Sequence, residues 1–131
     1  MRIVVDTNLW VSYLLQPNSP LSPRLDQITR AHTLLYSFDT VAELAAVLTR
    51  RKFARYVDPE DVRTFIERLA ELGEEVAVTS RIRACRDPKD DKFLALALDG
   101  DADCILSGDS DLLELNPFEG ASILKVSDFR D

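Results

Sequence analysis

Arg2-Ile3-Val4-Val5-Asp6-Thr7-Asn8 opens the chain with a short apolar run that ends at an aspartate. A run of this kind is typical of a strand buried on both faces of a parallel sheet. Residues 9–15 then show a helical pattern, which ends in the segment 16–20 with its two prolines. A strand followed by a helix is the unit from which parallel α/β sheets are built.

The same alternation continues along the chain. Further strands are predicted at residues 34–38, 75–79, 103–106 and 123–126, and further helices at residues 21–30, 41–51, 59–72, 92–98 and 111–115. Alternating strands and helices predict an α/β fold, a three-layer α/β/α sandwich on a mostly parallel sheet of four or five strands. The length of 131 residues fits a single domain, residues 1–131.

The composition argues against several kinds of site and location. The longest apolar run, residues 93–98, is too short to span a bilayer, and Asp6 interrupts the apolar stretch of a signal peptide. We therefore expect a cytoplasmic protein with no membrane contact. Cys85 and Cys104 form no CxxC pair and lack a nearby histidine, which argues against zinc. The single histidine, His32, gives no basis for a Ser-His-Asp or Cys-His triad.

The net charge bears on any interaction with nucleic acid. The chain has 23 acidic and 16 basic residues, a net charge of −7, whereas proteins that bind nucleic acid through a broad cationic surface have the opposite balance. Either nucleic acid is not the substrate, or cations bound by the acidic residues supply the positive charge.

Four acidic residues occupy equivalent places in the predicted pattern. They lie at the carboxyl end of a strand or in the first turn of the helix that follows: Asp6, Glu43, Asp91 and Asp109. In an open parallel sheet these places share one edge, where ligand crevices form. Carboxylates gathered there repel one another unless a hard cation such as Mg²⁺ or Mn²⁺ neutralises them. A metal pair about 4 Å apart would activate water for phosphodiester cleavage.

Each acid also has a purely structural interpretation. Asp6 could cap the next helix, and Glu43 could complete a capping box with Thr40. The aspartates within 87–91 could complement a helix dipole, and those within 109–111 could be caps. Only the joint placement of these acids at one edge favours a metal centre.

Four motifs of the chain resemble the PIN domain, most closely the branch of toxins of type II toxin–antitoxin systems related to VapC. In the family's order they are Val4–Asn8, Glu43–Leu44 with Val47–Leu48 and Arg51–Phe53, Arg86–Leu94, and Leu106–Leu112. The resemblance implies a Mg²⁺- or Mn²⁺-dependent ribonuclease that cleaves single-stranded RNA. It also implies a homodimer and an antitoxin partner.

The resemblance assigns roles by motif. Asp6, Glu43 and Asp91 match the three most characteristic acids, and Asp109 matches the fourth, with Asp111 as its rival. Asp91 is preferred to its neighbours because the apolar helix face begins directly after it. The polar residues that match those supporting the centre are Thr7, Asn8 and Ser107.

Two basic clusters could contact RNA. The stronger combines cations with interleaved aromatic residues and consists of Arg50, Arg51, Lys52 and Arg55 beside Phe53 and Tyr56. It could equally be a solvated helix end. The weaker one comprises Arg81, Arg83 and Arg86. An antitoxin is expected on apolar surface of the helices around residues 21–28 and 41–48.

Single positions argue against two other functions. A phosphatase of the haloacid dehalogenase type needs an aspartate where Asn8 stands, and a receiver domain needs a phosphoacceptor where Val78 and Thr79 stand. The alternatives that stay open are a PIN-fold protein that binds RNA without cleaving it and a housekeeping RNA-processing enzyme that is not a toxin.

Overall fold

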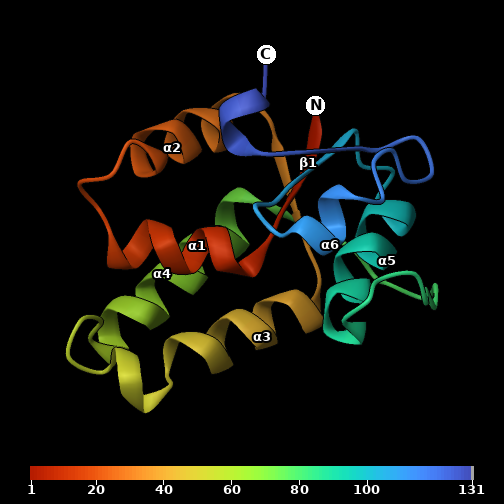
Figure 1. Ribbon diagram of the computed structural model, residues 1–131. Coiled ribbons are helices and arrows are strands. Elements are labelled where there is room, and N and C mark those ends of the chain that lie inside the picture. Colours follow the sequence, from red (N-terminus) through yellow and green to blue (C-terminus); the bar gives the residue numbers. More distant parts are fainter. Residues whose placement is uncertain (131) are drawn as a thin grey trace.

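The computed structural model describes residues 1–130 and contains one parallel sheet (Figure 1). Its five strands lie in the order β3-β2-β1-β4-β5, and every neighbouring pair is parallel. The strands are β1 (Arg2–Val5), β2 (Thr33–Tyr36), β3 (Glu74–Glu75), β4 (Cys104–Leu106) and β5 (Ser122–Leu124). The first strand of the chain is therefore the central strand, as its uniformly apolar sequence requires.

Helices cover both faces of this sheet. They are α1 (Thr7–Leu15), α2 (Leu21–Ala31), α3 (Phe38–Leu48), α4 (Pro59–Leu72), α5 (Asp91–Asp99) and α6 (Ser110–Leu113), with single-turn helices η1 (Arg51–Phe53), η2 (Pro88–Asp90) and η3 (Val126–Asp128). Figure 1 shows α1, α2 and α4 on one side and α5 and α6 on the other. The three-layer α/β/α sandwich is thereby confirmed.

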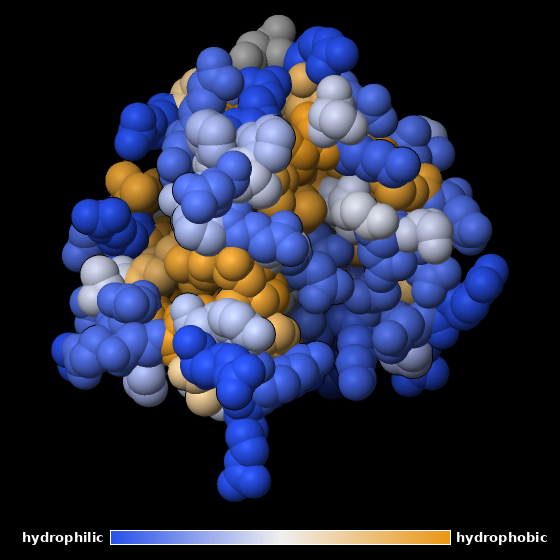
Figure 2. Space-filling view, turned by 60° about the vertical axis from the view of Figure 1, so that its left-hand side comes forward, coloured by the Kyte–Doolittle hydropathy of each residue, from blue (hydrophilic) through white to orange (hydrophobic). Residues whose placement is uncertain are grey.

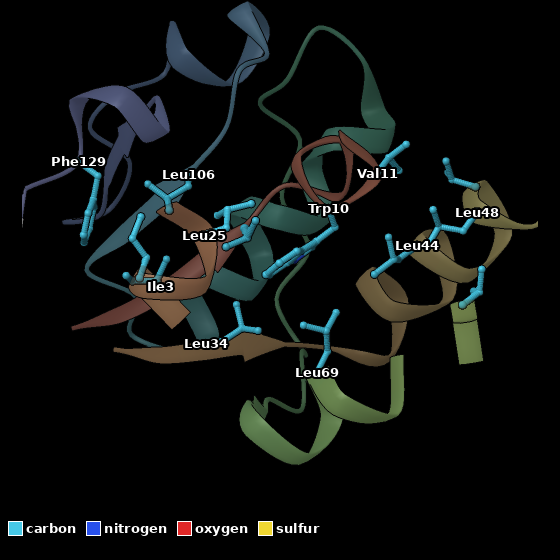
Figure 3. Close-up of a cluster of buried hydrophobic side chains, with 14 of the residues drawn as sticks. Ile3, Trp10, Val11, Leu25, Leu34, Leu44, Leu48, Leu69, Leu106 and Phe129 are labelled. Carbon is cyan, nitrogen blue, oxygen red and sulfur yellow. The ribbon is translucent and has the colours of Figure 1, made fainter. Parts of the chain in front are cut away.

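The core is divided by the sheet into two apolar clusters. Ile3 and Val5 of β1 point into the cluster under α1 to α4, and Val4 points into the cluster under α5 and α6. Successive side chains of a strand point to opposite faces, so a run without polar residues fills both clusters. Figure 3 shows the larger cluster, in which Trp10 of α1 lies among side chains from α2, α3 and α4.

This packing corrects the expected partner surface. Most of the large apolar side chains of residues 21–28 and 41–48 are buried in the chain's own core. They are Leu25, Ile28, Leu44, Val47 and Leu48. An amphipathic helix buries its apolar stripe against the sheet, so the stripe does not remain for another protein.

Two element boundaries differ from the prediction for identifiable reasons. Helix α3 begins at Phe38 rather than residue 41, because Ser37 and Thr40 form the capping box: the Ser37 N–H donates to Thr40 Oγ1 at 3.0 Å and the Thr40 N–H to Ser37 Oγ at 3.2 Å. The predicted capping box of Thr40 with Glu43 is wrong. Strand β3 is Glu74–Glu75; the Val76 N–H still donates to the Tyr36 carbonyl, but the N–H groups of Thr79 and Ser80 donate to the Asp99 carboxylate and not to a strand.

No helix among residues 1–130 combines the length and the apolar character that crossing a bilayer demands. Cys104 is buried, Cys85 is half-buried, and neither is in a disulfide. His32 ends α2, where its ring packs edge-on against Phe129.

Candidate metal centre

Asp6 lies at the carboxyl end of the central strand and is almost completely buried. Its Oδ1 accepts the Asn8 backbone N–H at 3.1 Å, which caps α1, and its Oδ2 accepts Ser107 Oγ–H at 2.7 Å. Burial raises the pKa of Asp6, the two hydrogen bonds lower it, and the charges of Asp109 and Glu43 raise it further, with a net upward shift. Capping and membership of an acidic centre therefore coexist in this residue.

Ser107 connects the ends of two adjacent strands. It follows β4, is fully buried, and accepts the Asp109 N–H on the same Oγ that donates to Asp6, at 3.0 Å. Asp109 in turn caps α6 by accepting the Asp111 N–H at 2.9 Å. Thr7 is buried in the first turn of α1. Of the polar residues predicted to support the centre, Ser107 contacts Asp6 through its side chain, whereas Asn8 is exposed and contacts Asp6 only through its backbone N–H.

A third acid joins this edge, and it is Asp90. Carboxylate oxygens of Asp90, Asp109 and Asp111 all lie within 4.8 Å of one another. Burial raises the pKa of Asp90 to about 7, assisted by a hydrogen bond and repulsion from Asp109 and by the charge of Asp6. The available sequence signal was Asp87-Pro88, which starts η2 and places Asp90 at its junction with α5.

Asp91, which the motif favoured, points elsewhere. Its Oδ1 accepts the backbone N–H groups of Ala84 at 3.1 Å and Cys85 at 2.8 Å. Burial alone would raise the pKa of Asp91, but these bonds from Cys85 and Ala84 hold it below its ordinary value. Neighbouring residues on a helix differ by roughly 100° in direction, and here Asp90 lies in the acidic cluster while Asp91 faces the backbone of residues 84 and 85.

Glu43 lies in the second turn of α3, beside the cluster and paired with a cation. Its carboxylate forms an ion pair with Lys92 Nζ, and the two side chains are 27% and 23% exposed. The charge of Glu43 contributes to the raised pKa of Asp6, which places it near the acids. Glu43 takes no part in the cap of α3.

One arginine borders the acids. Arg86 Nε lies 3.8 Å from Asp111 Oδ1, and a terminal guanidinium nitrogen of Arg86 lies 3.8 Å from Glu114. The arginine is mostly exposed, so this pairing is weak. Asp111 is thus partly compensated, whereas Asp109 is not.

The stronger of the two predicted basic clusters lies away from this edge. Arg50, Arg51, Lys52 and Arg55 are exposed around η1. Glu43 is in the second turn of α3 and η1 follows the end of that helix, so the remaining five residues of α3, about 7.5 Å of helix, lie between them. Lys52 instead lies over the Phe53 ring, 5.0 Å from its centroid.

The donor set fits a hard divalent cation. Among residues 1–130, none of Asp6, Asp90 and Asp109 has an ion-pair partner of its own. Carboxylate oxygens are the ligands that Mg²⁺ and Mn²⁺ prefer, and a bound cation would relieve the repulsion that raises the pKa of Asp90. The edge has the chemistry of a divalent metal site.

The chain is similar to known proteins over most of its length. Residues 2–111 match the PIN domain family. An uncharacterized protein of Methanocaldococcus jannaschii is 26% identical over 117 residues, which are 88% of this chain and 75% of that protein. A chain in the crystal structure of VapBC2 from Rickettsia felis, bound to a DNA fragment from their promoter, has a TM-score of 0.63 at 11% identity, covering 94% of this chain and 97% of that one.

FitAcB from Neisseria gonorrhoeae has a TM-score of 0.56 at 18% identity, covering 97% of this chain and 99% of that one. At such identities the two solved structures speak for the fold. The family match spans most of the chain and includes Asp6, Asp90, Asp109 and Asp111. On this match, the sheet order and the acidic edge, the chain belongs to the PIN domain family.

Proposed function

We propose that this protein is a nuclease that uses Mg²⁺ or Mn²⁺ to cleave phosphodiester bonds of single-stranded RNA. The observation that carries the proposal is the carboxyl cluster of Asp90, Asp109 and Asp111 at the carboxyl edge of the sheet, to which Ser107 links Asp6. Membership of the PIN domain family supports nuclease activity. A bound cation would also explain how a chain with a net charge of −7 binds nucleic acid. The cation, and not a basic surface, would hold the scissile phosphate of the substrate.

The residues that would hold the metal are Asp6, Asp90 and Asp109, with Asp111 at the rim. A divalent ion bound there supplies a Lewis acid for the phosphoryl oxygen and lowers the pKa of a coordinated water. Ser107 fixes the Asp6 carboxylate through its hydroxyl. Asp90 must lose its proton to become a ligand, and a nearby cation favours the ionised form.

Glu43 remains in the proposal with a different immediate partner. It lies close enough to raise the pKa of Asp6, but Lys92 already neutralises it. Glu43 therefore serves either as a ligand after Lys92 moves away or as the anchor that keeps Lys92 beside the substrate. Asp91, predicted as a ligand from the motif, acts in this proposal as a support of the loop it binds.

Cleavage of labelled single-stranded RNA by the purified protein tests the proposal. We expect cleavage with Mg²⁺ or Mn²⁺ and none in EDTA. Cleavage rates of a duplex RNA and a single-stranded DNA of the same sequence show which nucleic acid the protein prefers. Persistence of cleavage in the chelator would overturn the metal mechanism. A protein that binds the RNA but never cuts it would be the RNA-binding alternative.

The resemblance to VapC-related toxins extends the proposal to a cytoplasmic homodimeric toxin with an antitoxin partner. The similar solved structures are VapBC2 and FitAcB. A groove of 580 Å³ between α1, α2 and α4 offers a place for a partner segment, with Tyr13, Leu14, Phe65 and Leu72 among its lining. Leu72 is 71% exposed, and Figure 2 brings this side forward with apolar surface in view.

Charged residues border the apolar floor of this groove. They include both signs: Asp26, Arg30, Asp61, Arg68 and Glu71. An amphipathic helix with a mixed-charge polar face would match such a groove. We propose this groove, in place of the buried stripes of residues 21–28 and 41–48, as the antitoxin site.

A further inference from the structure

Residues 79–85, which we term the strap, run along α5 without regular secondary structure. Two carboxylates of α5 fix the strap at its two ends. Asp99 accepts the N–H groups of Thr79 at 2.7 Å and Ser80 at 2.9 Å. Asp91 accepts two more N–H groups at the other end of the strap. Carboxylates holding several N–H groups form strong bonds, so the strap has a defined course despite its irregular backbone.

The strap presents two arginines on one side. Ile82 packs toward the apolar cluster under α5, while Arg81 and Arg83 on either side of it are exposed. Extended backbone alternates the direction of its side chains, which explains this arrangement. Among residues 1–130 neither arginine has an ion-pair partner. The backbone that carries these two arginines is therefore fixed, while their guanidinium groups take part in no ion pair within the described residues.

Both arginines line a pocket of 230 Å³ that adjoins the acidic edge. Its remaining polar lining includes Lys92, Ser80 and Ser37. Lys92 pairs with Glu43, so a single side chain touches both the pocket and the group beside the metal centre. The pocket and the acids thus lie next to each other along the same edge.

The pocket lining includes two arginines, Arg81 and Arg83, that take part in no ion pair among residues 1–130, whereas Lys92 is paired with Glu43. Arg81, Arg83 and Lys92 face Asp39 and Asp91 across it, and the Asp91 carboxylate is already occupied by backbone N–H groups. Guanidinium groups match phosphate oxygens in a bidentate manner, and hydroxyls add further donors. A volume below the roughly 300 Å³ of drug-sized sites suits a phosphate with its sugar.

We propose that this pocket binds a backbone phosphate of the RNA substrate. The phosphate bound there is one that neighbours the scissile bond in the same strand. The inference rests on the proposed nuclease function and names the surface that receives the substrate. Arg81 and Arg83 contact the phosphate, and Asp91 and Asp99 position the strap that carries them. The strand then passes along Lys92 to the acids. The weaker of the two basic clusters in the sequence is, in this account, the RNA-binding one.

The test compares two double variants with the same change of charge. Arg81→Gln/Arg83→Gln removes the pocket cations, and Arg50→Gln/Arg51→Gln removes two exposed cations of the cluster around η1. On the RNA oligonucleotide that the wild type cleaves, the first should raise KM roughly tenfold with kcat nearly unchanged. The dependence of log affinity on log salt should fall by about 0.7 for each phosphate that the variant no longer binds. The second variant should behave like the wild type.

The possible results separate a failure of the pocket proposal from a failure of the proposed nuclease function. An unchanged KM and salt dependence in Arg81→Gln/Arg83→Gln, with wild-type cleavage intact, would overturn the pocket alone. A loss confined to Arg50→Gln/Arg51→Gln would transfer RNA binding to the other cluster. A wild-type protein that cuts no RNA would defeat the proposed function, and the pocket with it. Thermal melting of both variants at the wild-type temperature shows that the fold is kept.

Discussion

Adjacent aspartates at the start of α5 have opposite roles in this structure. Asp90 faces Asp109, and its pKa is raised to about 7 by burial and by that neighbour. Asp91 faces two amides, and its pKa is lowered. The motif alone could not separate them, because both precede the same apolar helix face. The direction of each side chain depends on η2, which the Asp87-Pro88 start of that turn sets.

Substitution of each aspartate by asparagine in metal-free protein should separate these roles. Because the pKa of Asp90 is raised, its ionisation costs stability as pH increases from about 4 to about 7, and Asp90→Asn should raise the melting temperature by a few degrees at pH 8. Because the pKa of Asp91 is lowered, its charge stabilises the fold at neutral pH, and Asp91→Asn should lower the melting temperature.

Added Mn²⁺ completes this comparison. Its stabilising effect should shrink in Asp90→Asn and persist in Asp91→Asn. The reverse result, with Asp91→Asn losing the response to Mn²⁺, would return Asp91 to the ligand role that the motif assigned. Differential scanning fluorimetry at matched protein concentration measures both effects.

At the scale of elements, local sequence predicted most of what forms. Apolar runs predicted β1 and β4, and the Asp58-Pro59 start and the final Gly73 predicted α4. Two errors had a common cause, a side chain that competes for backbone groups. In the first turn of α3 the Ser37 hydroxyl accepts the Thr40 N–H. The Asp99 carboxylate, twenty residues further along the chain, accepts the Thr79 N–H at the end of the predicted strand. Partners so distant in sequence leave no local signal.

The start of α3 offers a test in which capping and chemistry are separate. Thr40→Ala leaves the buried Ser37 N–H without its acceptor, which should cost about 1 kcal/mol or more in the free energy of unfolding. The response to metal and the cleavage of RNA should persist in Thr40→Ala.

Glu43→Gln, in contrast, should reduce RNA cleavage, because it breaks the ion pair with Lys92 beside the centre. Urea unfolding and a cleavage assay measure these; equal cleavage by Glu43→Gln and wild type would exclude Glu43 from the centre.

The whole molecule has an excess of negative charge, and the proposed substrate is an anion. The two are compatible if cations are concentrated where the substrate binds. The net charge is −7, yet the edge of the sheet combines acids that suit a divalent cation with arginines on the strap. The sequence predicted that acidic residues gather at one edge of the sheet, because parallel topology brings those positions together. It could not show the strap pocket, which exists only where α3, α5 and residues 78–83 meet.

The toxin proposal predicts an effect on growth. Expression of the wild-type chain alone in a bacterial host should arrest growth, and Asp6→Asn at an equal protein level should relieve the arrest. Leu72→Glu, in the groove between α1, α2 and α4, should still arrest growth but should escape neutralisation by a co-expressed antitoxin. Harmless expression of an enzyme that cleaves RNA in vitro would identify a housekeeping ribonuclease.

The most direct measurement is the rate of single-stranded RNA cleavage as Mn²⁺ is added to metal-free protein, for wild type and Asp6→Asn. Asparagine keeps the acceptor for the Asn8 N–H but removes the charge at the centre of the cluster. We expect no cleavage before metal is added, a saturable increase in the wild type, and a rate lower by roughly 100-fold or more in Asp6→Asn. Cleavage without metal, or an Asp6→Asn rate equal to that of the wild type, would contradict the assignment of this edge as a metal-dependent nuclease centre.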